Sequence, residues 1–372
     1  MEPENASLRE ALGIALMMDE RLDDALSAFD EAIEIDPDAA GAFMQRARIL
    51  ALRGDREKAL DALHRVIEIE PDSAVPLVLR ARIHQQAGDT PSALADLQLV
   101  LGEQPDHPAA LELRGLIAAD SGDYASAIRD FRRLATLAPE DAVIEGQLGM
   151  LHLAAKQPRE AIQRFDRALE IDAEQFVSRR GRSDARISIG DHPAAVADLE
   201  KALSIDPENT GVLNNLAWLL ATSPDDTLRD GKRAIGLASK ACELSEWKEA
   251  HIISTLAAAH AEAGDFDQAC SFSEKAVAAG SESEEIKLQL EKELDQYRIQ
   301  KPWRERQQVE DAKLEGVAVA DDGEPAPEVG EPAATVAGKG EPPAAMDKPG
   351  REGSDGSSGS DRRPVKHRRP FE

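Results

Sequence analysis

The stretch from Gly122 to Pro139, GDYASAIRDFRRLATLAP, contains a complete helix together with the signals that begin and end it. Gly122 and Asp123 form a turn signal, because glycine readily adopts the left-handed conformation that closes a preceding helix. The apolar positions that follow have the spacing of one helix face: Ala127, Ile128, Phe131 and Leu134. Pro139 stops this helix, because proline lacks a backbone N–H. The stretch therefore predicts an amphipathic helix between a Gly-Asp turn and a proline corner.

The same signals recur along the chain with a period of 34 residues. Proline occupies four successive slots and, after one omission, a later one: Pro37, Pro71, Pro105, Pro139 and Pro207. An alanine lies twelve residues before every slot, including the omitted one: Ala25, Ala59, Ala93, Ala127, Ala161 and Ala195. Each unit is interpreted as helix, turn, helix and corner. Because neither helix can bury its apolar stripe alone, we expect an all-α solenoid of stacked antiparallel helix pairs.

This pattern resembles the tetratricopeptide repeat, which has a small residue at position 8, alanine at position 20 and a large apolar residue at position 24. Position 8 holds Gly13, Ala47, Ala81, Gly115, Gly149 and Ser183. Position 24 holds Phe29, Leu63, Leu97, Phe131, Phe165 and Leu199. The register continues without a gap through six units, residues 6–209. The resemblance implies a right-handed superhelical array. Glu20, Lys156 and Ala173 depart from the pattern, and we expect them to lower local stability only.

A seventh unit, predicted over residues 210–249, contains a lengthened turn. Ala217 holds position 8, but the alanine of position 20 falls at Ala234, five residues late. The motif NLAWLLATSPDDTLRDGKRA resembles a bacterial variant of the repeat, which implies no catalytic activity. It lacks the alternating ligands of an EF-hand loop and the glycine and hydroxyl residues of a phosphate loop. We interpret it as a structural connection with a short helix beginning near Asp225 and Asp226.

Three more segments complete the predicted organisation. An eighth repeat spans residues 250–283, and the capping segment over residues 284–308 is predicted to contain a polar helix from about Ser283 to Gln300 that Pro302 ends. Residues 309–372 are dominated by Gly, Pro, Ala, Glu and Asp and end in the basic sequence DRRPVKHRRPFE. This acidic tail with a basic end is predicted to be disordered, because it lacks the apolar residues that a core needs.

Composition excludes several classes of function. The chain has 44 basic and 71 acidic residues, a net charge of −27, so we expect no nucleic-acid partner for the solenoid. Cys242 and Cys270 have no metal-binding spacing and predict no disulfide. No segment approaches the 18 apolar residues of a membrane span. The acidic N-terminus lacks the basic region of a signal peptide, which predicts a cytoplasmic protein; an export signal upstream of this sequence is the open alternative.

The repeat supplies its own internal alignment for charged residues. Position 7 is arginine in four units: Arg46, Arg80, Arg114 and Arg182. Three of these units have aspartate at position 23: Asp96, Asp130 and Asp198. This co-occurrence predicts an ion pair between the two helices of one repeat, and it favours that interpretation over a ladder of arginine ligands. Arg46 has no such partner within its own repeat.

Other residues that could carry chemistry also have structural interpretations. Histidines at position 11 are interpreted as packing residues, since His84 and His152 lie two repeats apart, beyond the reach of one shared metal. The sequence contains no catalytic motif, so we expect neither enzymatic activity nor a cofactor or bound metal.

The candidate site is the groove that positions 2, 5, 9 and 12 of the first helices line in this family. Its proposed residues are Met44, Arg48, Val78, Arg82, Leu116, Met150, Arg180 and Trp218. Arg48 and Arg82 share position 9 in adjacent repeats, roughly 10 Å apart, and are placed to bind a carboxylate. The residues of a chaperone-binding carboxylate clamp do not occur in three consecutive units.

The sequence therefore predicts a non-catalytic scaffold that binds a protein partner through an extended peptide or a helix. Two alternatives stay open: a regulatory or substrate-holding subunit of an enzyme complex, and an envelope-associated assembly factor.

Overall fold

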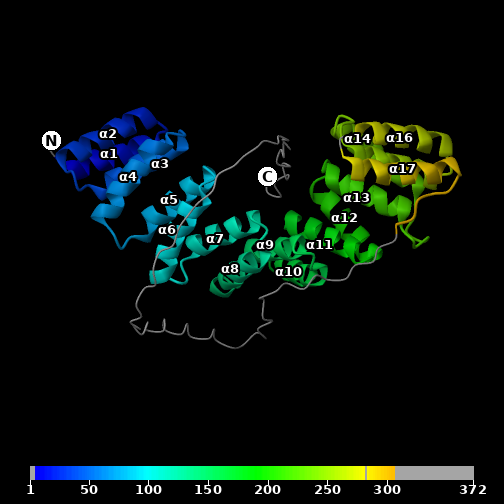
Figure 1. Ribbon diagram of the computed structural model, residues 1–372, viewed down its shortest axis with the longest axis horizontal. Coiled ribbons are helices and arrows are strands. Elements are labelled where there is room, and N and C mark those ends of the chain that lie inside the picture. The colour runs from blue at the N-terminus through cyan, green and yellow to red at the C-terminus, as the bar shows by residue number, and fades with distance from the viewer. Residues whose placement is uncertain (1–4, 281–282, 306–372) are drawn as a thin grey trace, which may run out of the picture. The chain divides into compact units, whose positions relative to one another are not determined.

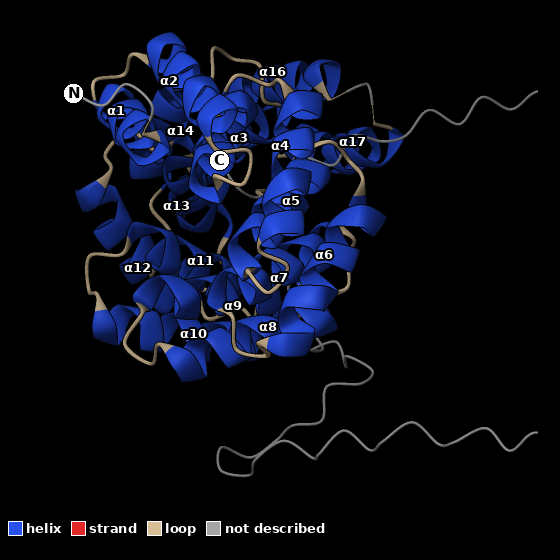
Figure 2. Cartoon of the chain, turned by 90° about the vertical axis from the view of Figure 1, so that its left-hand side faces the viewer, coloured by secondary structure: helices blue, strands red, loops and turns tan. Residues whose placement is uncertain are grey.

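The computed structural model describes residues 5–280 and 283–305, all within the first of two units, Met1–Ala318. These residues form seventeen α-helices and no strand (Figures 1 and 2), which confirms the predicted all-α solenoid. The tail predicted to be disordered, residues 309–372, lies outside the described residues. In the part of the chain that the structure describes, no helix is both long and apolar enough to cross a membrane.

Each repeat contributes a first helix of 13 residues and a second helix of 14 residues. The first helices are α1 (Ala6–Met18), α3 (Ala40–Leu52), α5 (Ala74–Gln86), α7 (Pro108–Asp120), α9 (Ala142–Ala154), α11 (Phe176–Ser188), α13 (Thr210–Thr222) and α15 (Ala250–Glu262). The second helices are α2 (Leu22–Ile35), α4 (Arg56–Ile69), α6 (Thr90–Glu103), α8 (Tyr124–Leu137), α10 (Pro158–Ile171), α12 (His192–Ile205), α14 (Gly231–Leu244) and α16 (Phe266–Ala279). The last helix is α17 (Glu284–Arg298).

The first helices form one layer of the array and the second helices form the other. Each second helix packs on the first helix of its own repeat and on that of the next repeat, as α8 does with α7 and α9. First helices of neighbouring repeats also contact one another, for example α9 with α11 and α13 with α15. Side chains of successive first helices therefore form one continuous surface along the array.

The core is built on small residues where the two helices of a repeat cross. Alanine at position 20 is fully buried in all eight repeats: Ala25, Ala59, Ala93, Ala127, Ala161, Ala195, Ala234 and Ala269. Alanine at this position lets two helix backbones approach closely without losing helix propensity. The buried clusters continue from one repeat to the next, so each repeat depends on its neighbours for burial.

Positions 8 and 24 are matched in volume within each of the first six repeats. A Cβ atom added to Gly13 would lie 2.5 Å from the ring of Phe29, and one added to Gly149 would lie 2.5 Å from the ring of Phe165. Gly115 faces Phe131 in the same way, at 2.9 Å. The repeats with leucine at position 24 have alanine or serine at position 8 instead. Close packing thus explains a covariation that is visible in the sequence.

The turns show where this chain departs from the regular repeat. Glu20 and Lys156 adopt the left-handed conformation, with φ of 59° and 58°, at the position where five other repeats have glycine. The turn between α13 and α14 comprises residues 223–230, against three residues in the other repeats, which matches the predicted five-residue lengthening. The connection from α14 to α15 also has one extra residue, which agrees with the predicted bounds of the seventh unit, residues 210–249.

Candidate peptide-binding groove

The predicted groove residues differ in how much surface they offer. Arg48 and Arg82 are exposed, whereas Met44, Leu116, Met150, Arg180 and Trp218 are partly buried. Val78 is buried in the core and contributes little to any surface. The structure therefore leaves two exposed arginines, a partly apolar middle and a polar far end along the first helices.

The two exposed arginines have few partners among the described residues. Arg48 donates one long hydrogen bond within its own helix, from Nη1 to Oε1 of Gln45 at 3.4 Å. Among the described residues, Arg82 has no hydrogen bond or ion pair. Most other arginines of the array are paired with carboxylates, such as Arg46 with Asp30 at 2.7 Å. Arg48 and Arg82 are thus available to an acidic group from outside.

Three exposed valines share one position of the first helices, and the groove residues predicted from the sequence do not include them. Position 2 is valine in three repeats, and the side chains are well exposed: Val75 51%, Val143 62% and Val177 52%. Valine at the same repeat position in three units was the available signal. Exposed apolar side chains in register on one helix layer favour contact with an apolar partner segment.

The far end of the groove contains a polar network between α11 and α13. Asn215 donates a hydrogen bond from Nδ2 to Oδ1 of Asp184, 2.9 Å away, and Asn214 lies beside it with a buried side-chain oxygen. Burial raises the pKa of Asp184 to about 6, although the charge of Arg180 and the bond from Asn215 oppose this rise. The network places an easily protonated carboxyl group on the groove surface.

We expect Asp184→Asn to stabilise the fold at pH 8 by about 1–2 kcal/mol, since one pKa unit corresponds to about 1.4 kcal/mol. The folded-state pKa lies above the unfolded value, so the charged carboxylate destabilises the fold above pH 6, and this cost disappears as the pH falls towards 4. Asparagine keeps the acceptor that Asn215 uses. Urea unfolding at pH 8 and pH 4 measures the difference, with the exposed Asp61→Asn as control; an equal gain at both pH values would contradict the shift.

The Arg–Asp ion pairs predicted from the repeat alignment are confirmed. Arg80 binds Asp96 with two hydrogen bonds of 2.8 and 2.6 Å, and Arg114 binds Asp130 in the same way at 2.8 and 2.7 Å. Arg182 makes the third two-bond pair with Asp198. These arginines hold the two helices of a repeat together, so they are not free to serve as ligands.

The lengthened turn is a structural connection, and the structure corrects one detail of its prediction. No helix forms within residues 223–230; Asp225 accepts hydrogen bonds from the backbone N–H and the hydroxyl of Thr227, at 3.0 and 2.7 Å, in a tight turn. Ser223 bonds His192 of the preceding repeat at 2.9 Å. The turn therefore contacts the preceding repeat through Ser223.

Arg229 joins this turn to the next repeat. Its Nε donates to Oε1 of Glu262 at 3.0 Å, and its Nη1 donates to the carbonyl of Ser223 at 2.9 Å. Asp230 caps α14 by accepting from the backbone N–H of Arg233 at 2.9 Å. The RDG part of the motif thus fixes the end of α15 against the start of α14.

The capping helix ends close to the position predicted for it. It was expected to reach about Gln300 before Pro302 and it ends at Arg298, where Gln300 reverses the chain with a positive φ of 56°; residues 306–308 of the predicted cap lie outside the described residues. Residues 301–305 then lie against α13 and α15, where Trp218 donates its indole N–H to the carboxylate of Glu305. The sequence-predicted groove residue Trp218 is therefore in contact with the chain itself.

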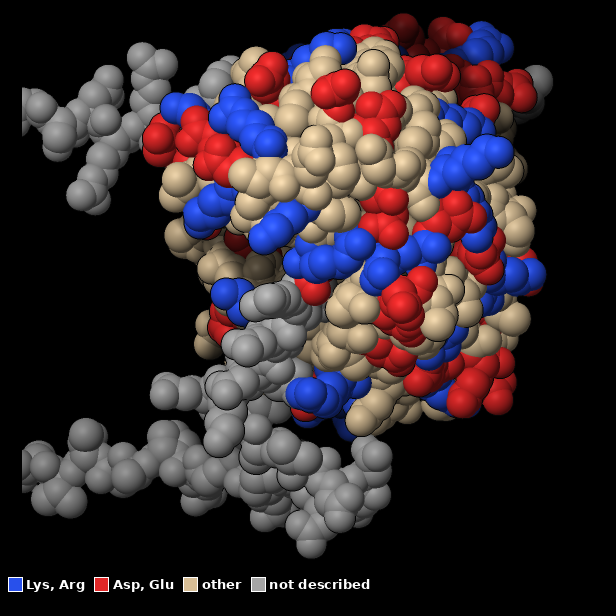
Figure 3. Space-filling view, turned by 90° about the vertical axis from the view of Figure 1, so that its right-hand side faces the viewer, with Lys and Arg blue, Asp and Glu red and all other residues tan. Residues whose placement is uncertain are grey.

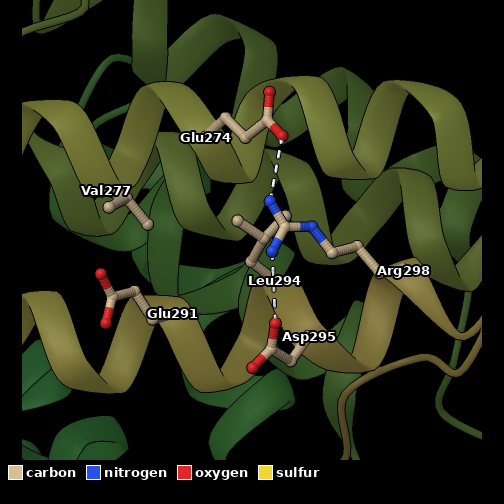
Figure 4. Close-up of a pocket in the computed structure, with 6 residues that line it drawn as sticks. All are labelled: Glu274, Val277, Glu291, Leu294, Asp295 and Arg298. Atoms are coloured by element: carbon tan, nitrogen blue, oxygen red, sulfur yellow. Dashed lines mark hydrogen bonds and ion pairs between the residues drawn. The ribbon is translucent and has the colours of Figure 1, made fainter.

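A pocket between α16 and α17, with a volume of about 420 Å³, lies apart from this groove (Figure 4). Arg298 bridges two of its carboxylates, Glu274 and Asp295, at 3.3 Å each. The residues around it include no histidine, cysteine or serine. Across the described part of the chain, no group of three His, Cys, Asp or Glu residues is arranged to hold a metal ion.

The surface at the C-terminal end of the array carries both signs of charge. On the face shown in Figure 3, basic and acidic side chains alternate around exposed uncharged areas. This face offers no extended surface of a single sign, in contrast to the basic stripe typical of nucleic-acid binding.

Sequence profiles described as tetratricopeptide repeat match residues 16–83, 78–142, 118–177 and 182–209, slightly more than half of the chain. The helix lengths, turns and small-residue positions described above agree with these matches. The chain belongs to the tetratricopeptide repeat family. The matches do not include the seventh repeat, which has the lengthened turn, or the eighth repeat.

Several known tetratricopeptide repeat proteins are similar to this chain. The tetratricopeptide repeat and J domain-containing co-chaperone DNJ1 of Fusarium oxysporum f. sp. lycopersici is 28% identical over 137 residues, covering 37% of this chain and 26% of that protein. The chain thus spans about a quarter of this relative.

Two solved structures are also similar. A tetratricopeptide repeat protein from Parabacteroides merdae is 18% identical with a TM-score of 0.48, covering 70% of this chain and 98% of that one. YrrB, described as a TPR protein with an unusual peptide-binding site, is 19% identical with a TM-score of 0.44, covering 50% and 96%.

Proposed function

We propose that this tetratricopeptide repeat protein is a non-catalytic scaffold that binds an extended segment of a partner protein along its first helices. The surface between repeats 2 and 6 is the candidate site. Membership of the repeat family supports a role in protein–protein interaction, and the chain folds almost entirely into repeats within its described residues.

One observation carries the proposal of a binding surface: Arg48 and Arg82 are exposed and lack carboxylate partners among the described residues of a strongly acidic chain. The exposed valines at position 2 and the partly buried Leu116 and Met150 provide apolar contact beside them. A partner segment with a carboxylate followed by apolar side chains fits this combination.

We expect the double change Arg48→Ala and Arg82→Ala to weaken partner binding at least about tenfold, because a charged hydrogen bond at a partly buried interface typically contributes about 2 kcal/mol or more. Peptides selected on the full chain from a displayed random library, or a partner isolated by affinity capture, serve as ligands. Dissociation constants are measured by calorimetry, and circular dichroism checks that the fold is unchanged.

The matched control removes two arginines from second helices, Arg56→Ala and Arg129→Ala, which are also exposed. This control keeps the net charge equal to that of the test variant, so a general electrostatic effect would weaken binding in both. If binding survives the test variant but is lost in Met150→Glu, recognition depends on the apolar middle of the groove. If neither variant matters, the proposed site is wrong.

A further inference from the structure

The carbonyl groups at the end of α13 are satisfied in an unusual way. The last carbonyls of a helix have no partner within the helix and need one from elsewhere. In the regular repeat of α7, the N–H groups of Gly122 and Asp123 in the short turn bond the carbonyls of Ala119 and Ala118, at 3.0 and 2.9 Å. In α13 the lengthened turn leads the chain away after Ser223, so the turn cannot reach every carbonyl.

Residues 304 and 305 take over two of these carbonyls. The backbone N–H of Glu305 donates to the carbonyl of Thr222 at 3.0 Å, and Nη1 of Arg304 donates to that of Ala221 at 3.3 Å. The lengthened turn itself bonds Leu220, through the N–H of Asp230 at 2.9 Å. The five extra residues of repeat 7 have therefore opened an acceptor site that an extended segment fills.

A carboxylate on the neighbouring repeat completes the site. Arg304 donates from Nη2 to Oε2 of Glu262 at 2.5 Å, while Arg229 holds the other oxygen of the same carboxylate. The side chain of Glu262 is mostly buried, and Arg229 is itself fixed by the carbonyl of Ser223. The carboxylate is thus oriented by the lengthened turn before it meets Arg304, which is the condition for a strong charge-assisted bond.

Side chains on either side of Arg304 extend the contact. Trp303 packs against the buried cluster of the last repeats, and Glu305 accepts a hydrogen bond from the indole of Trp218. Pro302 favours an extended backbone in the residue before it. The segment Lys301–Glu305 therefore binds through four groups: the indole of Trp303, the guanidinium of Arg304, and the carboxylate and backbone N–H of Glu305.

We propose that α13, the lengthened turn and α15 form a second peptide-binding site, which residues 301–305 fill in cis. The same site binds an extended segment of a partner protein in which an aromatic residue is followed by an arginine and an acidic residue, as in residues 303–305. A tethered segment has an effective concentration in the millimolar range, so a partner must displace it to bind. The site is separate from the surface of repeats 2–6 and does not depend on the ligand of that surface.

The test uses a fluorescent peptide of residues 299–305, IQKPWRE, with an amidated C-terminus, titrated against full-length chains. We expect the double variant Trp303→Ala and Arg304→Ala to bind this peptide at least tenfold more tightly than the unchanged chain, because its own segment no longer fills the site. Adding Glu262→Gln to the double variant should reduce binding at least tenfold again. A peptide with Trp and Arg replaced by Ala should not bind.

Circular dichroism checks the fold of each variant, and Arg304→Ala alone serves if the double variant is unstable. Equal affinity of the unchanged and released chains would show that the segment does not occlude the site. Absence of saturable binding to a folded, released chain up to millimolar peptide would show that the surface is no peptide site. The change Arg48→Ala with Arg82→Ala must leave this affinity unaltered, which separates the result from the test of repeats 2–6.

Discussion

Asp198→Ala is expected to lower the free energy of unfolding by about 3–5 kcal/mol, the usual cost of removing one partner from a buried ion pair. Asp198 is only 3% exposed and accepts hydrogen bonds from Arg182 at 2.8 and 2.6 Å and from Arg186 at 2.7 Å. Arg179 lies 3.7 Å away. Alanine would leave three largely buried guanidinium groups between α11 and α12 without their shared carboxylate.

The matched control is Asp166→Ala, which removes a second carboxylate from the same Arg182. Asp166 lies 2.5 Å from Nη1 of Arg182, but its side chain is 44% exposed, so its loss should cost about 1 kcal/mol or less. Urea unfolding of the full chain gives the overall change. Because repeat arrays can unfold in stages, amide hydrogen exchange in α11 and α12 reports the local effect. Equal losses of unfolding free energy in Asp198→Ala and Asp166→Ala would show that burial of Asp198 does not determine the cost of its removal.

The contrast between these two aspartates shows how far the sequence allowed the charge pairs to be predicted. The pair of Arg182 with Asp198 was predictable, because three repeats have arginine at position 7 together with aspartate at position 23. The pairs of Arg46 with Asp30 and of Arg182 with Asp166 cross from one repeat to the preceding one. An alignment made within single repeats cannot show them, although both join residues that are sixteen apart, as the predicted pairs do.

The helix pairs were predictable for a similar reason, because the same pattern of residues recurs in every repeat. Alanine at position 20 lies at every crossing of two helices in a repeat. In the seventh repeat this alanine, Ala234, comes five residues later than the period predicts, and the lengthened turn lies directly before it. The path after Arg298 had no such support, because it occurs once in the chain. There Pro302 predicted only the end of the helix, whereas the extended segment that follows depends on contacts with Thr222 and Glu262, which are distant in sequence.

The exposure of the candidate groove residues could be predicted only in part, and the groove itself stays a prediction. The family resemblance predicts a groove lined by positions 2, 5, 9 and 12, and Arg48 and Arg82 at position 9 are exposed. Val78 occupies position 5 as Met44 does, yet Val78 is buried, whereas Met44 is partly exposed. The accessibility of a groove position depends on side chains of adjacent repeats, which a single repeat pattern does not contain.

Gly231→Ala is expected to lower the free energy of unfolding by about 1–3 kcal/mol, the usual cost of overpacking a close contact. A Cβ atom at residue 231 would lie 2.7 Å from the backbone nitrogen of Ala263 and 3.0 Å from the carbonyl carbon of Glu262. Backbone atoms cannot rotate away as a flexible side chain can. The start of α14 would have to move from the end of α15, and this shift would also strain the contact of Arg229 with Glu262.

Gly236→Ala on the same helix provides the control, because a Cβ atom there meets no atom within 4 Å. Alanine in an exposed helix interior should stabilise the chain by about 0.5–1 kcal/mol. The two variants add the same methyl group to α14. Changes of opposite sign in the free energy of unfolding by urea would therefore show that the close contact of residue 231 with the end of α15 is the cause. If Gly231→Ala stabilises the chain as much as Gly236→Ala does, the two helices lie further apart in solution. The glycine of the RDG motif would then have no packing role, and the oriented carboxylate of Glu262 would have to be explained by Arg229 alone.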